Sequence, residues 1–490
     1  MSRPDPKVVL LVAHDYPPFT GSRASTAVRW VDQVARDGTA VEVITPSDTD
    51  EEFTHLDGAG NLVHRIAASR SYTFKMLEKV APPLAGRIDS QRLRLAARAA
   101  EKVFERSRLW NRKILWGESL LGEVALVAPE AAAALWQLLA LGAPANRRLE
   151  AQPVRSIDVV ICTYERLEEL IVSIDSVLGE VDGARQAGLE ARVRVIHQNA
   201  DLPGRLSMAR PDLAARGGLS LEFVSPPSLT RARNHAIATS SADLVVFVDD
   251  DVRLEPGFLA AYVEAASAHP GAIGFVGRIQ SPSEPVAGRP RAIGQVRATG
   301  YVDVNYNSVN EDAVYVPMTP MGANMAFRRQ RMNRLFGKAW FDAGLTGSAI
   351  REETTLSMRI HRAGEYLVFV PRAALTHFEA RTGGCNNRGT RSLKERIEHR
   401  SLETLFLARV YQRAGWLHAV SALRMAILAV GRARGPRDKL STGAVHLAGY
   451  FRGRRRFRVL GPGDPRLLSV VPAAIPAPSA GAAPPGEKAG

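Results

Sequence analysis

From residue 156 onward, short apolar runs rich in β-branched residues alternate with segments of helical length. The run "SIDVVICTY" precedes a helical segment over 168–178, and the runs "RVRVIHQ" and "LSLEFVS" precede another over 230–240. The run "ADLVVFVDDD" follows and ends in three aspartates. Such alternation predicts an α/β fold with a mostly parallel sheet that helices cover on both faces.

The N-terminal part begins with a smaller unit of the same kind. The run "KVVLLVA" predicts a buried strand, residues 24–37 predict a helix, and "AVEVITP" predicts a second strand. Residues 72–150 are rich in Ala, Leu and Arg and predict several helices. The predicted divisions are a partial Rossmann-like and helical region (1–150), an α/β domain (151–390), basic helices (391–460) and a disordered tail rich in Pro, Ala and Gly (461–490).

The class of protein is narrowed by cysteine content and hydropathy. Only two cysteines occur in 490 residues, which argues against a disulfide-stapled secreted fold. The N-terminus lacks the apolar core of a signal peptide, and no run of 18 clean apolar residues predicts a transmembrane helix. The expected location is the cytoplasm.

The formal charge of +14 is concentrated in one part of the chain. Between 381 and 460 there are 18 Lys and Arg against 4 Asp and Glu, and the rest of the chain is balanced. Helices with apolar stretches lie in the same region, which favours peripheral binding to the anionic inner face of a membrane. A solvated basic surface packed on the core is the alternative.

Three adjacent aspartates, Asp249, Asp250 and Asp251, follow the apolar run over 244–248. Ligands of open α/β sheets bind at the carboxyl ends of strands. Adjacent carboxylates repel one another unless a cation compensates their charge. Alternate residues of an extended segment point the same way, so Asp249 and Asp251 can share Mg²⁺ or Mn²⁺, which can in turn hold a diphosphate. The alternative is a solvated acidic turn.

Two further segments carry groups that suit a phosphate. The first strand of the domain ends in Thr163, Tyr164, Glu165 and Arg166, and the segment "LTRARNHAI" places Arg231, Arg233 and Asn234 at the start of a helix. Cations and a helix N-terminus attract phosphate. Alternatively, the two arginines only decorate the helix surface.

Three segments downstream complete a recognisable series: "MGANMAFRR", "REETTLSMRIHRAG" and "PRAALTHFEA". In this order and spacing, the motifs over residues 156–380 resemble the family 2 glycosyltransferases, which have the GT-A fold. The resemblance implies a metal-dependent, inverting transfer of a sugar from a nucleotide-diphosphate donor to a hydroxyl acceptor. Polysaccharide, cell-envelope glycan or glycoconjugate biosynthesis is the implied setting.

The resemblance also implies roles for individual residues. Asp249, Asp251 and His377 would bind the metal, with Asp251 as the direct ligand. The donor-binding residues that the resemblance implies are Thr163, Glu165, Gly322 and Asn324. The other predicted donor-binding residues, which follow from their own chemistry and their place at strand ends or at a helix start, are Arg166, Gln198, Arg233, Asn234, Asp249 and Asp250. Glu352 and Glu353 match the late acidic pair, and Glu353 occupies the position of the catalytic base. Because the family has Asp there and this chain has the longer Glu, the choice between the two stays open.

One position departs from the family pattern. The second strand normally ends in an aspartate that grips the base or ribose, whereas this chain reads "VIHQNAD". Gln198 or Asn199 can still form a hydrogen bond to a base, and Asp201 lies nearby. The identity of the nucleotide is therefore left open.

Two other functions and a second resemblance complete the predictions. Residues 7–46 are similar to the opening of the family 4 glycosyltransferases, which have the GT-B fold; this implies a docking or acceptor-binding region. The Arg-rich segment "YFRGRRRFRVL" would suit nucleic-acid binding, although the acidic strand end would repel nucleic acid. A non-catalytic scaffold on a transferase fold is the other alternative, against which the intact acidic residues argue.

Overall fold

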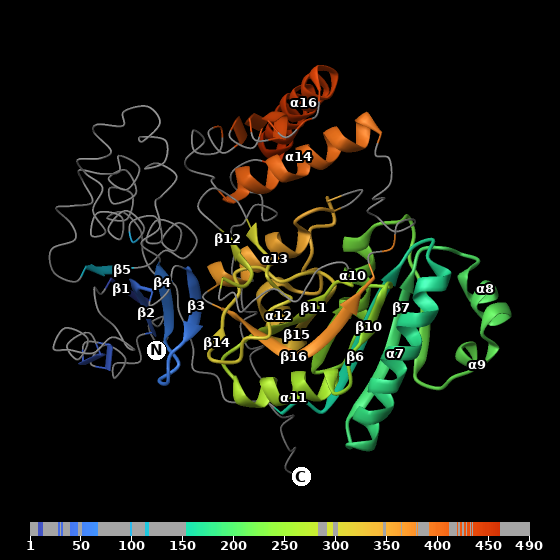
Figure 1. Cartoon of the computed structure of the whole chain (residues 1–490). Coiled ribbons are helices and arrows are strands. Elements are labelled where there is room, and N and C mark those ends of the chain that lie inside the picture. The colour runs from blue at the N-terminus through green and yellow to red at the C-terminus, as the bar shows by residue number, and fades with distance from the viewer. Residues whose placement is uncertain are drawn as a thin grey trace, which may run out of the picture.

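The structure is a computed structural model of the 490-residue chain (Figure 1). It describes residues 8–12, 28, 29, 31, 32, 40–47, 51–66, 99, 113–116, 153–282, 292–296, 302–345, 349–363, 365–378, 380, 392–410, 419, 422, 423, 426, 427, 429–431, 433 and 435–460.

An eight-stranded sheet forms the centre of the molecule, in the order β10-β16-β11-β15-β9-β6-β7-β8. Four of its seven pairings are parallel, and the antiparallel ones involve β15 and β10. The predicted strands and the α/β class are confirmed. The strands are β6 (Ser156–Thr163), β7 (Glu190–His197), β8 (Leu219–Phe223), β9 (Leu244–Val248), β10 (Val252–Leu254), β11 (Gly274–Gln280), β15 (Asn324–Arg328) and β16 (Leu367–His377).

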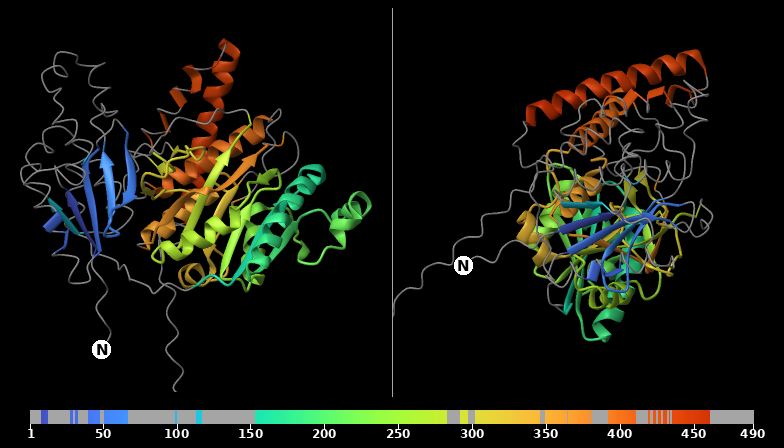
Figure 2. Two further views of the ribbon diagram at one scale, coloured as in Figure 1. Left: turned by 60° about the horizontal axis from the view of Figure 1, so that its bottom comes forward. Right: turned by 90° about the vertical axis from the view of Figure 1, so that its left-hand side faces the viewer.

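Helices cover this sheet on both faces, as predicted (Figures 1 and 2). The two predicted helices correspond to α7, which runs on beyond residue 178, and to α10. The helices of this part are α7 (Leu167–Gln186), α8 (Leu202–Ala209), α9 (Pro211–Ala214), α10 (Leu229–Thr239), α11 (Phe258–Ala268), α12 (Arg329–Phe336) and α13 (Glu352–Arg362). Two short strands, β12 (Gln295–Val296) and β13 (Val302–Asp303), form a separate ribbon.

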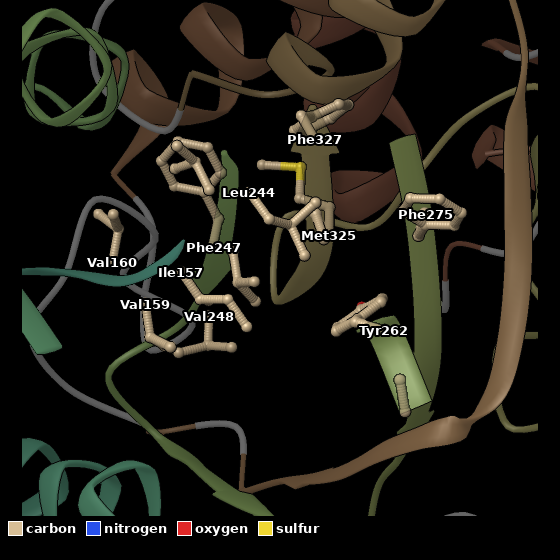
Figure 3. Packing of buried hydrophobic residues seen from close by; sticks show 14 of the residues in the cluster. Ile157, Val159, Val160, Leu244, Phe247, Val248, Tyr262, Phe275, Met325 and Phe327 are labelled. Carbon is tan, nitrogen blue, oxygen red and sulfur yellow. The ribbon is translucent and has the colours of Figure 1, made fainter. Parts of the chain in front are cut away.

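The core lies between the central strands and these helices. Figure 3 shows Ile157, Val159 and Val248 of the parallel strands close together, and Met325 and Phe327 along the neighbouring strand β15. Phe247 and Phe327 pack edge-on, with ring centroids 6.5 Å apart. The near-continuous apolar strands seen in the sequence are explained by this burial, because both faces of each central strand are covered.

A second sheet contains the N-terminal strands, in the order β14-β3-β4-β2-β1-β5. Its strands are β1 (Val8–Val12), β2 (Ala40–Pro46), β3 (Phe53–Leu56), β4 (Leu62–Ile66), β5 (Lys113–Trp116) and β14 (Val314–Tyr315). The predicted parallel pair of β1 and β2 is confirmed. Strand pairing between β3 and β14 crosses the predicted boundary near residue 150 (Figure 1).

One prediction for this region was wrong. Residues 113–116 lie in the stretch 72–150 that was expected to be helical, but they form β5 and pair in parallel with β1. The segment "KILW" carries β-branched and aromatic residues, and the partner strand overrides the helical tendency of its neighbours. Most of the other predicted N-terminal helices, and the predicted tail over 461–490, lie outside the described residues.

The helices α14 (Leu393–Val410) and α16 (Pro436–Leu460) confirm the predicted helical C-terminal region. They pack against each other, and Glu398 of α14 forms ion pairs with Arg452 and Arg456 of α16 at 3.0 and 2.7 Å. Within the part of the chain that the structure describes, no helix has the length and apolar character needed to cross a membrane.

Candidate active site

The three aspartates occupy the short junction between β9 and β10. Strand β10 pairs antiparallel with the end of β16, and this register places Val252 opposite His377. His377 Nε2 consequently lies 2.9 Å from Asp251 Oδ1 and 3.7 Å from Asp249 Oδ2. One ligand atom from each of these three residues lies within 4.8 Å of the other two. The predicted metal-binding residues therefore converge on one point.

Asp250 faces a different set of partners. Thr163 Oγ1 donates to Asp250 Oδ2 at 2.7 Å, and Arg166 Nη1 donates to Asp250 Oδ1 at 2.8 Å. Burial raises the pKa of Asp250 to about 6, although Arg166 and Thr163 act in the opposite direction. Asp250 thereby ties the end of β6 to the acidic junction.

The residues at the junction fit a hard divalent cation. Burial by itself would raise the pKa of Asp251, but His377, the Ala380 N–H and Arg166 lower it to about 2, so the carboxylate is ionised at neutral pH. Its Oδ1 is buried and, among the residues that the structure describes, it has no partner in hydrogen-bond geometry, although His377 Nε2 lies 2.9 Å away. Two carboxylates and an imidazole are a donor set that Mn²⁺ or Mg²⁺ accepts.

Arg233 joins the acidic junction to helix α13. Its side chain is buried, and its guanidinium forms an ion pair with Glu352 and donates to the Gly322 carbonyl at 3.0 Å. Asp249 Oδ1 lies 3.7 Å from the same group. The guanidinium also lies 5.8 and 5.4 Å from the ring centroids of Phe247 and Phe341, within the range of cation–π attraction.

Glu353 is the next residue of α13 and has a different environment. Burial raises its pKa; its own backbone N–H, Arg351 and Arg233 oppose this rise, while Asp249 adds to it. The chain enters the helix through Ala349 and Arg351, both with positive φ (43° and 65°). Non-glycine residues in that region carry strain, which is often found beside functional groups.

A sequence model of one protein family matches this chain over residues 151–400, about half of its length, and that family is described as glycosyltransferase-like family 2. The chain belongs to this family. Membership agrees with the resemblance seen in the motifs, and the family 2 domain holds every residue of the site described above. No curated protein sequence matches the chain.

Several solved structures are similar to the family 2 protein at low identity. The mannosyltransferase PcManGT from Pyrobaculum calidifontis, with GDP-Man and Mn²⁺, has 17% identity and a TM-score of 0.39 over 62% of this chain and 88% of its own. GalNAc-T7 with UDP, GalNAc and Mn²⁺ has 13% identity and a TM-score of 0.41, over 65% and 61%. TarS 1-349 from S. aureus with UDP-GlcNAc has 14% identity and a TM-score of 0.35, over 52% and 66%.

Other predicted donor-binding residues of the family 2 domain have their polar atoms engaged within the protein. The Asn234 side chain pairs with the backbone of Phe341 through both its oxygen and its nitrogen, at 3.0 and 2.8 Å. Asn324 is fully buried and bonds the carbonyls of Arg278 and Ala373. The side-chain oxygen of Gln198 accepts from the Ser228 N–H at the start of α10. These contacts position backbone around the site.

Two more predicted residues are Glu165, which follows β6, and Gly322, which precedes β15 by two positions. Glu165 is exposed, has a positive φ of 58°, and donates its backbone N–H to Asn199 Oδ1 at 2.8 Å. Gly322 lies against Arg233, and a Cβ at this position would be 2.8 Å from Arg233 Nη2. A side chain at this position would require the Arg233 guanidinium to shift. The sequence did not identify Phe247 and Phe341 as the walls around Arg233, because no local pattern indicates which aromatic rings meet that side chain.

Removing the Arg233 guanidinium is expected to destabilise the family 2 domain strongly. In Arg233→Met, Glu352 would remain buried without its cation, and breaking a buried pair in this way costs about 3–5 kcal/mol. Urea unfolding should give this difference in the free energy of unfolding. Because the two side chains act together, Arg233→Met with Glu352→Gln should lose less than the sum of the single variants.

An exposed Arg–Glu pair provides the matched control. Arg372 and Glu264 lie 2.7 Å apart with more than half of each side chain exposed. Arg372→Met should change the free energy of unfolding by less than about 1 kcal/mol. Equal losses for Arg233→Met and Arg372→Met would contradict the role given to the buried pair.

Proposed function

We propose that this protein is a metal-dependent, inverting glycosyltransferase that moves a sugar from a nucleotide-diphosphate donor to a hydroxyl acceptor. The observation that carries the proposal is the convergence of Asp249, Asp251 and His377 beside the Arg233–Glu352 pair. A cation position and a carboxylate base are thus neighbours in a domain of family 2. The setting that suits this activity is the synthesis of a polysaccharide, a cell-envelope glycan or another glycoconjugate.

Mn²⁺ or Mg²⁺ held by Asp249, Asp251 and His377 would supply positive charge to the diphosphate leaving group. Glu353 takes the proton of the acceptor hydroxyl, whose oxygen forms the new bond to the anomeric carbon. The bond from that carbon to the diphosphate breaks, and the electron pair leaves with the diphosphate. Attack from the opposite face inverts the configuration.

Glu353 suits the role of base better than Glu352. The ion pair with Arg233 occupies Glu352 and stabilises its charge, which weakens it as a proton acceptor. The pKa of Glu353 is raised, which brings it nearer to neutral pH and makes the carboxylate a better base. Glu352 then orients Arg233, and Glu353 contacts the acceptor.

The proposal is tested by incubating the protein with a panel of nucleotide sugars and Mn²⁺, with and without candidate hydroxyl acceptors. Mass spectrometry should detect release of the nucleoside diphosphate from one donor class, dependent on the metal. Proton NMR of the product should show the anomeric configuration opposite to that of the donor. Release without metal, or retention of configuration, would contradict the mechanism.

The same proposal places the protein at the anionic inner face of a membrane, through an exposed apolar stripe on α16 formed by Leu440, Leu447 and Phe451. These side chains are 76%, 60% and 63% exposed. Leu447 follows Leu440 by seven positions, and Phe451 follows Leu447 by four. On a helix, these spacings make the three side chains project within about 40° of one another. The opposite side of α16 is fixed to α14: a Cβ on Gly453 would lie 2.5 Å from the Ser401 carbonyl. Figures 1 and 2 show α14 between α16 and the catalytic domain.

The charge of α16 favours anionic lipid over another apolar partner. The helix contains seven Lys and Arg and one Asp. Two of its arginines pair with Glu398, whereas Arg437, Lys439 and Arg455 are exposed. Basic residues beside an apolar stripe are typical of helices that lie in the interface of an anionic membrane.

Replacing all three residues of the stripe with Ser is expected to weaken binding to phosphatidylglycerol vesicles about 10-fold or more, because less apolar surface enters the lipid. Vesicle co-sedimentation measures this loss. Met208→Ser on α8 is the control, since Met208 is 81% exposed but lies outside the stripe. Unchanged vesicle binding by the triple variant would overturn the membrane assignment. Displacement of the vesicles from the wild-type protein by a random oligonucleotide would overturn it too.

A further inference from the structure

The four residues after β14, Val316 to Thr319, form a buried segment that we term the strap. Val316, Met318 and Thr319 are 2%, 2% and 1% exposed. The strap touches the N-terminal sheet at its beginning and the catalytic helix α13 along its length. It is therefore a physical connection between two parts of the chain whose relation the sequence leaves open.

The beginning of the strap belongs to the N-terminal sheet. Strand β14 pairs antiparallel with β3, and the Val316 N–H extends this ladder by donating to the Thr54 carbonyl at 2.9 Å. The rings of Phe53 and Tyr315 lie 5.9 Å apart. Phe53 is 5% exposed and packs in the same hydrophobic cluster as the strands of the eight-stranded sheet. The two sheets thus share one core at this point.

The remainder of the strap binds one face of α13. Ser357 follows Thr354 by three positions and His361 follows Thr354 by seven, so that the three side chains lie on the same side of the helix. His361 Nε2 lies 3.2 Å from the Pro317 carbonyl, the Ser357 hydroxyl donates to the Met318 carbonyl, and the hydroxyls of Thr354 and Thr319 are 2.9 Å apart. All three helix side chains are buried.

The strap is also held from its other side. The N–H groups of Met318 and Thr319 both donate to the Gly294 carbonyl, at 2.8 and 3.1 Å, and the Tyr306 hydroxyl donates to the Thr319 carbonyl. Its backbone groups are therefore paired on both sides, and a displacement at β3 would be transmitted to α13 rather than absorbed. The first residues of α13 are Glu352 and Glu353.

From these contacts we infer that the N-terminal sheet is a positioning element of the active site, which sets the placement of α13 and its carboxylates through the strap. The inference rests on the proposed function, because it takes Glu353 as the base. Thr354 and Ser357 are positioning residues in this scheme. The acidic junction and β6 lie on other elements and meet α13 through Arg233, so we expect the strap to affect donor binding less than turnover.

The first test separates turnover from donor binding. Thr354→Val with Ser357→Ala removes both hydroxyls, and kcat should fall about 10- to 100-fold, the effect of a small misplacement of a catalytic group. The dissociation constant of the donor's nucleoside diphosphate with Mn²⁺ should stay within about twofold, since the metal site is unchanged. Thr354→Ser with Ser357 unchanged retains both hydroxyls, and its kcat should be close to that of the wild type. Ser267→Ala, which removes a Ser–carbonyl bond on α11, is the control.

The second test reads the connection without using catalysis. Phe53→Ala, or Phe53→Leu if the first variant does not fold, should increase hydrogen exchange of the α13 amides by about tenfold, because local opening is easier without the buried ring. If the wild-type protein transfers no sugar, the proposed function fails but this measurement still decides the mechanical connection. Faster exchange confined to β3 and β14 would overturn the inference. So would a kcat of the hydroxyl variants that falls only in proportion to their folded fraction.

Discussion

Asp251→Asn is expected to abolish metal-dependent sugar transfer while leaving the fold intact. Asn keeps the shape of the side chain and can still accept the Ala380 N–H, which lies 2.8 Å from Asp251 Oδ2. It cannot supply the negative charge that a divalent cation requires from the buried Oδ1. Loss of the charge that offsets the leaving diphosphate should lower kcat by about 10²–10³-fold or more.

The measurements are the release of nucleoside diphosphate over a titration of Mn²⁺ and the direct binding of Mn²⁺ by calorimetry. Asp175→Asn is the matched control, because Asp175 pairs with Arg210 at the surface, at 2.6 Å, and away from the junction. Circular dichroism should show that both variants are folded. An Asp251→Asn protein with full activity that still depends on the metal would refute the assignment of the site.

Glu353→Gln is expected to show the second large effect. Gln has the shape of Glu but cannot take a proton, and removal of a general base lowers kcat by about 10²–10⁴-fold. The variant should bind metal and nucleotide as the wild type does, since Asp249, Asp251 and His377 are untouched. Single-turnover rates at saturating donor measure this difference.

The pH profile gives an independent test of Glu353. The base must be ionised, and burial raises its pKa above that of an ordinary glutamate. Wild-type kcat should therefore fall, as the pH is lowered, at a higher pH than an exposed Glu would give, with about a tenfold loss per unit below the pKa. The Glu353→Gln variant should lack this acid limb, and Glu352→Gln should retain it. The reverse result would make Glu352 the base.

Part of the candidate site could be predicted because it is contiguous in the sequence. The apolar run over 244–248 and the aspartates after it are neighbours in the chain, and strand ends of α/β sheets carry ligand sites. The orientation of Asp250 could not be predicted. Three adjacent carboxylates look alike in sequence, and only the tertiary structure shows that Asp250 meets Thr163 and Arg166 while its two neighbours lie beside His377.

The contacts of two buried side-chain amides could not be predicted from the sequence either. Asn234 and Asn324 match motif positions, so the sequence favoured contacts to the donor. In the structure, backbone groups far along the chain occupy their side chains. A buried amide must satisfy both its oxygen and its nitrogen, and whether a ligand or the backbone does so depends on packing.

The sequence by itself determined the α/β class, the family and the acidic strand end, because apolar periodicity and motif spacing are local properties of the chain. Tertiary structure decided how these parts meet. The register of β10 against β16 brings His377 to Asp251, and Arg233 reaches Glu352 across 119 residues. The pairing of β3 with β14 joins the N-terminal sheet to the strap. Contacts between distant residues arise only when strands pair and side chains are buried together, which no local pattern specifies.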